Sequence, residues 1–334
     1  MFMCIALREN VLYWKQTMQW KKNIDKLKGE KMIEFKPVTL EQRELYESYL
    51  LDGTERGCDY AFVNLYLWGR QRAAIVHDHM VMFSQFNRRS VYPYPVGSGD
   101  KKPVLDAIIA DAKERGITCR INGINSEQKE MLDKLYPGMF RFHYDRDSYD
   151  YVYDINNLAD LAGKKYQRKR NHYYRFRDAC PNYTVEPLSE DNIASVRQMT
   201  DKWYEIRQQE NPQSDYHLER TALTKAFRDY KELEMEGLVL LNEGEVLAVT
   251  LGSRISHNTF DVHFEKARWD MDGAYTAINY EFARHIRDKY PEIEYLNREE
   301  DMGLEGLRRA KESYHPHHLI EKDWAILLEE GYDY

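Results

Sequence analysis

The order of predicted elements between residues 184 and 328 constrains the fold more than any other feature of the sequence. Alternating apolar residues predict strands, and apolar residues spaced three and four apart predict helices. The strands fall at 184–186, 238–241, 246–255, 259–264, 293–296 and 319–328, and the helices at 191–209, 217–230, 275–289 and 304–313. This β-α-α-β-β-β-α-β-α-β order mixes both element types throughout and predicts an α/β fold.

Residues 32–156 carry a shorter series of the same kind. Thr39 and Gln42 form a capping-box pattern that opens a helix through about Leu51. The elements that follow are strands at 73–77, 80–85, 118–122 and 148–155 and helices at 103–115 and 126–136. A chain of 334 residues exceeds one average domain. We therefore expect two tandem domains, with 32–156 as a degenerate copy and 157–334 as the half that carries the functional site.

Residues 1–31 differ in composition from the rest of the chain, with seven Lys or Arg against three acidic residues. A basic helix lying on a membrane surface would have this composition. A second interpretation is that Lys28-Gly29-Glu30 reflects a purine-rich ribosome-binding sequence and that translation starts at Met32. We favour the second and expect 1–31 to be a non-native or flexible N-terminal extension.

The overall composition narrows the class of protein. The net charge of −8 disfavours a dedicated DNA-binding protein, and the 31% of charged residues indicates a soluble one. No run approaches the roughly 20 apolar residues of a membrane span. We expect a cytoplasmic protein without transmembrane segments, which is compatible with peripheral contact to a membrane. The four cysteines are scattered and the histidine pairs lack partners at ligand spacing, so no metal site is predicted.

The most informative segment is a basic one between residues 164 and 177, which contains seven cations and no acid. The cations are Lys164, Lys165, Arg168, Lys169, Arg170, Arg175 and Arg177. Tyr166, Tyr173, Phe176 and Cys180 follow helical spacing and form an apolar face. Such a helix can hold the phosphates of an RNA acceptor stem or of a nucleotide. The alternative is a solvated linker helix between the two halves.

A second segment, residues 297–316, places acids and cations where a predicted strand leads into a helix. The acids are Glu299, Glu300 and Asp301, and the cations are Arg298, Arg308 and Lys311. A carboxylate can deprotonate an attacking amine, and a cation can stabilise the oxyanion that forms. The alternative is structural: Asp301 caps the helix, and Glu305 pairs with Arg309 one turn later.

A third segment, residues 264–286, has Glu265 at a strand end and Gly273 at a helix start. A helix N-terminus suits an anion such as pyrophosphate. However, Gly273 stands alone, and Gly97 with Gly99 in the first half is equally incomplete as a phosphate loop. The pattern therefore only partly matches an acyl-CoA site.

Together these segments resemble the family named for the C-terminal domain of phosphatidylglycerol lysyltransferase, over about residues 33–328. The residues that carry the resemblance are Leu161-Ala162-Gly163-Lys164, Arg168-Lys169-Arg170-Asn171, Glu265-Lys266-Ala267, Gly273-Ala274-Tyr275 with Asn279, and Gly306-Leu307-Arg308-Arg309-Ala310-Lys311 ahead of Pro316. The resemblance implies tandem GNAT-like domains related to the Fem-type aminoacyltransferases. Members of that family transfer an amino acid from aminoacyl-tRNA to a lipid or cell-wall acceptor.

The resemblance implies that this chain transfers an aminoacyl group from tRNA to an amine or hydroxyl of a small-molecule, lipid or envelope-precursor acceptor. It places the basic helix against the tRNA and Asp301 and Lys311 at the transfer centre. Glu265 or Asp301 would assist deprotonation, and Lys311 and Arg308 would stabilise the oxyanion. The expected substrate-binding residues are Lys164, Arg168, Arg170, Asn171, Tyr275, Asn279, Arg298 and Arg308. No cofactor is expected. The alternatives are an acyl-CoA-dependent N-acetyltransferase and a non-catalytic RNA-binding protein.

Overall fold

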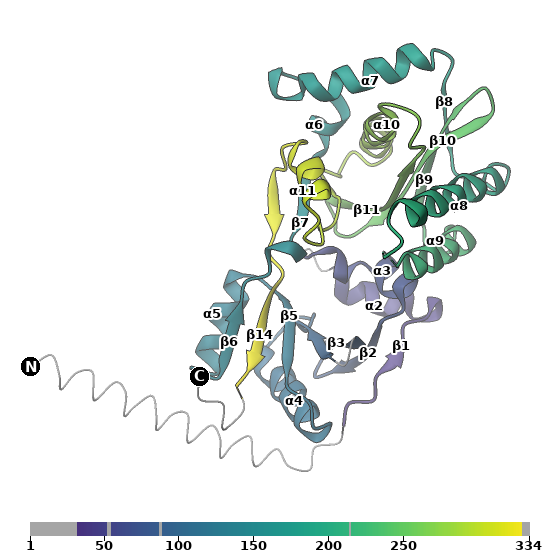
Figure 1. The fold of residues 1–334 in the computed structure, drawn as a ribbon. Coiled ribbons are helices and arrows are strands. Elements are labelled where there is room, and N and C mark those ends of the chain that lie inside the picture. The colour runs from purple at the N-terminus through teal and green to yellow at the C-terminus, as the bar shows by residue number, and fades with distance from the viewer. Residues whose placement is uncertain (1–31, 52–54, 87–88, 214, 329–334) are drawn as a thin grey trace, which may run out of the picture. The chain divides into compact units, whose positions relative to one another are not determined.

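The computed structural model describes residues 32–51, 55–86, 89–213 and 215–328 (Figure 1). The segment 1–31, for which an N-terminal extension was predicted, lies outside these residues. The described residues divide into two compact units. The first unit takes the described residues of Met1–Val38, Gly69–Ser148 and Glu321–Tyr334, and the second takes those of Thr39–Trp68 and Tyr149–Ile320.

The first unit is a seven-stranded sheet that carries two helices, α4 (Lys101–Glu114) and α5 (Ser126–Leu135). The strand order is β1 (Lys36–Pro37), β2 (Gln71–Val76), β3 (His79–Phe86), β4 (Arg89–Pro93), β5 (Arg120–Ile124), β14 (Asp323–Leu327) and β6 (Phe140–His143). Neighbouring strands are antiparallel except for the parallel pair of β4 and β5. Apolar side chains from the sheet and both helices, among them Tyr92, Ile108 and Leu132, form its core.

The second unit is also a seven-stranded sheet, with more helices around it. Its strand order is β13 (His318–Ile320), β7 (Asp150–Asp154), β12 (Tyr295–Asn297), β11 (Thr259–Ala267), β10 (Glu245–Arg254), β9 (Glu236–Asn242) and β8 (Thr184–Pro187). Only β11 and β12 are parallel. The helices are α2 (Arg43–Leu50), α3 (Phe62–Trp68), α6 (Ile155–Asp160), α7 (Gln167–Ala179), α8 (Ile193–Glu210), α9 (His217–Asp229), α10 (Ala274–Lys289) and α11 (Glu305–Glu312).

Helix α10 is central to the second unit because it packs against α6, α7 and the strands β9 to β11 (Figure 1). Its apolar side is buried, with Ile278 and Phe282 in the same core cluster as Phe260 of β11 and Phe176 of α7. Helix α8 packs on β10 and β11, and α3 packs on α9. The end of β11 therefore lies beside α8 and α10, and α7 packs on α10.

The two sheets share one pattern and exchange one strand. In each unit a helix follows the antiparallel series, then come a parallel strand, a second helix and an edge strand. The edge strands that end these series are β6 and β13. In each sheet one further strand is inserted between the parallel strand and this edge strand. In the first unit that inserted strand is β14, the strand after β13 in the sequence, and in the second it is β7, the strand after β6. Each sheet thus receives the strand that follows the other sheet's edge strand.

This exchange changes two sequence-based expectations. The predicted final strand at 319–328 is two strands in different sheets, β13 and β14. The predicted division at residue 156 differs from the compact units, because 39–68 and 149–156 belong to the second unit and 321–328 to the first. Local periodicity indicates a strand but does not select its sheet. The tandem GNAT-like α/β fold class itself is confirmed.

Candidate functional site

The basic segment forms a helix with a buried aromatic face, as predicted. A 3-10 turn at Lys164–Tyr166 leads into α7, and Tyr166 and Phe176 are fully buried. Gly273, at the start of α10, lies directly against the α7 backbone. A Cβ there would lie 2.2 Å from the carbonyl oxygen of His172, so only glycine permits this approach. Close packing of two helices therefore accounts for Gly273.

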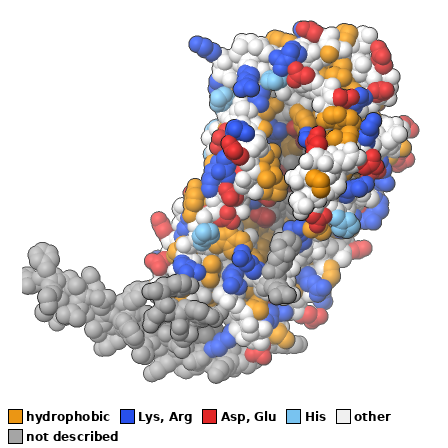
Figure 2. All heavy atoms as spheres, in the orientation of Figure 1, with side chains coloured by type: hydrophobic (Ala, Val, Ile, Leu, Met, Phe, Trp, Pro, Cys, Tyr) orange, Lys and Arg blue, Asp and Glu red, His pale blue; other side chains and the backbone are white. Residues whose placement is uncertain are grey.

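The seven cations of this segment have different roles. Lys164 and Arg168 are exposed, and the exposed Asn171 accepts a hydrogen bond from Gln167 Nε2 at 2.8 Å. Figure 2 shows Lys and Arg side chains standing out where Figure 1 places α7, with acidic side chains among them. Arg170 instead donates to the carbonyl oxygens of Leu161 and Gly163 and stabilises the start of its own helix. The predicted substrate-binding role of Arg170 thus competes with a structural one.

Lys169 is the cation that turns inward. Its Nζ lies 3.6 Å from the centroid of the Tyr314 ring, and the Cζ of Arg298 lies 4.9 Å from the same centroid. Burial, followed by the nearby charges of Arg298 and Arg168, lowers the pKa of Lys169 to about 8. Lys169 was not among the site residues predicted from the sequence. Its spacing of three residues after Tyr166 and four before Tyr173 already indicated the apolar face.

Arg298, Glu265 and Asn279 come together beside Lys169, from the loop after β12, from β11 and from α10. Arg298 Nη2 donates to Glu265 Oε1 at 2.9 Å, and Asn279 Nδ2 approaches Glu265 Oε2 at 3.4 Å. The sequence predicted all three as site residues, and the structure places them in one cluster. We call this group, with Lys169 and Tyr314, the Lys169–Arg298 cluster.

Two polar atoms of this cluster have no hydrogen-bond partner among the described residues. Arg298 Nη1 and Asn279 Oδ1 are both buried, one as a donor and the other as an acceptor. Leaving such groups unpaired costs about 1–3 kcal/mol each. A ligand that carries both an acceptor and a donor can pair with these two atoms.

Asp301, predicted as a catalytic base, is instead part of a buried ion pair. It is fully buried and accepts hydrogen bonds from Tyr151 Oη at 2.6 Å, from Arg308 Nε and Nη2 at 2.8 and 2.9 Å, and from the Gly303 amide. Burial alone would raise the pKa of Asp301, but the bonds from Arg308 and Tyr151 outweigh it and hold that pKa well below its usual range. Asp301 is therefore a poor proton acceptor, and Arg308 is occupied by it.

Lys311 supports the loop that presents Arg298. Its side chain is buried, and Nζ donates to the carbonyl oxygens of Arg298 and Glu299, the latter at 3.2 Å. Burial lowers the pKa of Lys311. The predicted transfer centre thus divides into two parts. Glu265, Asn279 and Arg298 form the cluster, whereas Asp301, Arg308 and Lys311 hold its loop in place.

Tyr275, in the first turn of α10, contacts an aromatic group on α8 that was not predicted from the sequence. Tyr275 Oη accepts a hydrogen bond from Trp203 Nε1 at 3.0 Å. Lys266 Nζ lies 4.1 Å from the centroid of the Trp203 ring. The same nitrogen forms an ion pair with Glu219 Oε1 at 2.6 Å. No local signal links α8 to β11, because the contact joins residues more than 60 positions apart.

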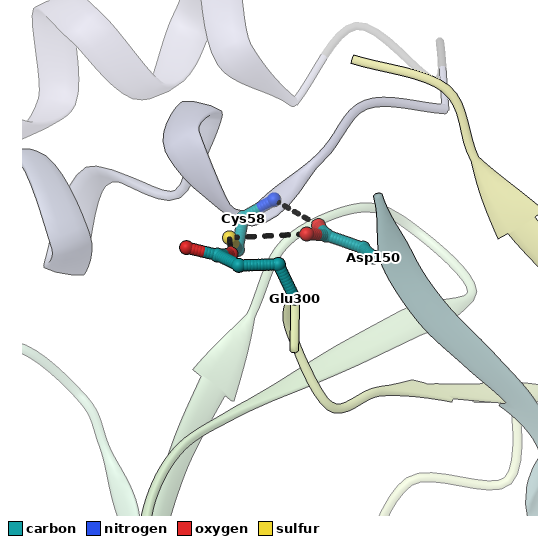
Figure 3. Close-up of side chains that lie close together, drawn as sticks. All are labelled: Cys58, Asp150 and Glu300. Atoms are coloured by element: carbon teal, nitrogen blue, oxygen red, sulfur yellow. Dashed lines mark hydrogen bonds between the residues drawn. The ribbon is translucent and has the colours of Figure 1, made fainter. Parts of the chain in front are cut away.

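Two further groups of acidic side chains lie in the second unit. Cys58, Asp150 and Glu300 converge with Cys58 Sγ 3.2 Å from Glu300 Oε2 and 3.4 Å from Asp150 Oδ1 (Figure 3). Asp261, His263 and Glu299 form the other group. The sequence predicted neither, because the first group joins residues from three separate segments of the chain and the second joins β11 to the loop after β12.

The strand order, repeated in both sheets, is that of a tandem GNAT-like protein. The chain belongs to the family described as phosphatidylglycerol lysyltransferase, C-terminal, whose model matches residues 53–326. The predicted resemblance is thus confirmed, and with it the coarser assignment to the transferases of this family. Among curated proteins none matches the sequence.

Solved structures agree with this family. A conserved protein of unknown function from Bacteroides thetaiotaomicron is 38% identical, with a TM-score of 0.84 over 89% of this chain and 100% of that chain. L-PGS from Bacillus licheniformis is 16% identical, with a TM-score of 0.65 over 90% of this chain and 94% of that one. FemX is 10% identical, with a TM-score of 0.59 over 89% and 98%. The last two likenesses concern the fold.

Within the part of the chain that the structure describes, no helix has the length and apolar character needed to cross a membrane.

Proposed function

We propose that the chain transfers an aminoacyl group from aminoacyl-tRNA to an amine or hydroxyl of a small-molecule, lipid or envelope-precursor acceptor, with the Lys169–Arg298 cluster as the transfer centre. One observation carries the proposal: Arg298 Nη1 and Asn279 Oδ1 are buried together without partners among the described residues. An aminoacyl ester is complementary to this pair, because its carbonyl oxygen accepts hydrogen bonds and its amino group donates them.

The reaction is a direct acyl transfer. The acceptor nitrogen or oxygen attacks the ester carbonyl carbon, the bond from that carbon to the ribose oxygen breaks, and a new amide or ester bond forms. Arg298 Nη1 donates to the carbonyl oxygen as negative charge develops on it. Asn279 Oδ1 accepts a hydrogen bond from the amino group of the transferred residue and orients it.

Lys169 is the best-placed group for the proton transfer. A pKa of about 8 leaves an appreciable neutral fraction near physiological pH, so its amine can take the proton from the attacking group and return it to the ribose oxygen. The bases predicted from sequence are less suitable. Asp301 is fully engaged by Arg308 and Tyr151, and Glu265 is paired with Arg298.

The outward side of α7 supports tRNA as the donor. Lys164 and Arg168 are exposed there, on the same helix that directs Lys169 inward. Cations on such a surface bind a polyanion by releasing its counterions. The phosphates of the tRNA would then contact Lys164 and Arg168, and the next side chain along the helix, Lys169, would reach the ester.

The test is a transfer assay with radiolabelled aminoacyl-tRNA and cell extract as the source of acceptor. We expect label to leave tRNA and to appear in a stable product with the wild-type chain. Arg309→Gln, an exposed change in α11, serves as the control that should keep full activity. Transfer from acetyl-CoA but not from aminoacyl-tRNA would replace this proposal by the acyl-CoA alternative. Binding of tRNA without transfer would support the RNA-binding alternative.

A further inference from the structure

A separate polar group lies on the face of β11 opposite to the Lys169–Arg298 cluster. A bulge produces this arrangement: Phe264 pairs with Leu251 and Val262 with Gly252, so His263 has no partner residue on β10. Val262 is in the core cluster that includes α10, whereas Phe264 stacks on Trp68 of α3 at 6.5 Å between ring centroids. Because the bulge interrupts the alternation, Asp261 and His263 face the α3 side and Glu265 faces α10.

His263 Nδ1 stands between two carboxylates. It lies 3.4 Å from Asp261 Oδ2 and 3.4 Å from Glu299 Oε1, and the ligand atoms of all three residues lie within 4.8 Å of one another. A charge-assisted N–H···O bond is shorter, about 2.7–2.9 Å. By contrast, the edge of a tetrahedron with metal–ligand bonds of about 2.0–2.1 Å is about 3.3–3.4 Å long. The spacing suits shared coordination better than direct ion pairing.

The surrounding side chains hold the three groups as outer-shell partners hold metal ligands. The other ring nitrogen, His263 Nε2, lies 2.7 Å from Ser253 Oγ, which orients the imidazole and leaves Nδ1 facing the carboxylates. Asn64 Nδ2 donates to Glu299 Oε1 at 2.9 Å. Asn64 is only 7% exposed, and its Oδ1 has no hydrogen-bond partner among the described residues. Asn64 Nδ2 also donates to the carbonyl oxygen of Cys58 at 3.1 Å, so this amide holds Glu299 in place.

We propose that Asp261, His263 and Glu299 bind a divalent first-row transition-metal ion, with Zn²⁺ as the probe. One imidazole and two carboxylates form a mixed nitrogen–oxygen set of the kind such ions take, and three protein ligands leave the fourth position of a tetrahedron open. The ion would fasten β11 to the loop after β12 that carries Arg298. This proposal is independent of the aminoacyl transfer proposed above.

The test uses the purified full chain after dialysis against a chelator. We expect it to take up one equivalent of Zn²⁺ and to gain about 4 °C in Tm at a hundredfold excess over Kd, whereas Mg²⁺ gives no such gain. His263→Ala should lose both effects. Cys58→Ser, in the neighbouring acidic group of Figure 3, should keep both.

Two outcomes would overturn the assignment. One is an absence of Zn²⁺ uptake by the wild-type chain, which would make His263 a buried partner of two acids. The other is uptake lost in Cys58→Ser and kept in His263→Ala. If His263→Ala does not fold, X-ray absorption at the zinc edge of the wild-type chain decides. Nitrogen and oxygen ligands support the site, and a sulfur ligand moves the ion to Cys58.

Discussion

The two units have the same strand pattern but differ beside the parallel pair of strands. In the first unit the end of β4 and the residues after it, 91–96, are all buried, and they are apolar or aromatic. In the second unit the corresponding strand, β11, carries Glu265 and Lys266 just before its last residue, Ala267. Its parallel neighbour leads into Arg298 and the acids after it. Beside its parallel strands, the first unit therefore packs apolar and aromatic side chains, whereas the second unit places charged side chains there.

The buried charges of the two units also differ in how they are satisfied. In the first unit Asp111 accepts from Tyr92 Oη and Arg115 Nε, both at 2.7 Å, and from the Ile33 amide at 2.8 Å. In the second unit Arg298 pairs with Glu265 yet keeps Nη1 buried without a partner among the described residues. A fully paired buried charge supports structure, whereas a partly paired one retains capacity for a ligand.

The largest expected effect is on transfer by Arg298→Gln. Loss of one preorganised oxyanion donor lowers turnover by about a hundredfold to a thousandfold. The matched change in the first unit is Arg115→Gln, which also removes a cation from a buried carboxylate. We expect Arg115→Gln to lower Tm and to leave the rate per folded molecule unchanged. An equal loss of rate in both variants would contradict the division of roles between the units.

The next effect concerns stability, through Asp301→Asn. The change removes the charge opposite Arg308, and breaking such a buried pair costs about 2–3 kcal/mol, since the Arg308 side chain is 31% exposed. Asp111→Asn in the first unit should cost a similar amount. Urea denaturation with a constant m-value measures both. A transfer rate that falls much further than the folded fraction of Asp301→Asn would return Asp301 to the catalytic residues.

A smaller effect is the pH dependence of transfer. Because the pKa of Lys169 is lowered to about 8, its neutral form increases as pH rises and saturates above that value. The wild-type rate should rise about eightfold between pH 6.5 and 7.5 and level off above about pH 9. Lys169→Arg keeps the charge but removes the base, so its rate should be low and nearly independent of pH. A wild-type profile that does not change across this range would exclude Lys169 as the base.

The smallest expected effect is on tRNA binding by the exposed face of α7. The double variant Lys164→Glu with Arg168→Glu should bind tRNA about tenfold more weakly. The slope of log Kd against the logarithm of the salt concentration should fall by roughly 1.5, because fewer counterions are released. Lys113→Glu with Lys134→Glu reverses two exposed cations of the first unit and is the control. Filter binding at several salt concentrations compares the pairs. Equal slopes for both would show that α7 is a solvated face.

Much of the secondary structure could be predicted from the sequence, because the spacing of apolar residues is a local property. The predicted helix at 217–230 is α9 (His217–Asp229), and the one at 275–289 is α10 (Ala274–Lys289). The capping box of Thr39 and Gln42 is present, although it opens a 3-10 turn before α2. Helices α3 and α6 were missed, since seven and six residues are too few for a periodic signal.

What the sequence determined by itself is therefore the element order, the aromatic face of α7 and the family, which depend on residue types at fixed spacing. Tertiary structure decided which sheet contains β7 and which contains β14. It also decided which charged side chains keep a hydrogen-bonding atom without a partner among the described residues. Arg298, Arg308 and Arg170 are alike in sequence, yet one joins the cluster, one pairs with Asp301 and one holds its own helix start. Those differences depend on partners far along the chain, and a buried charge takes its role from the groups that surround it.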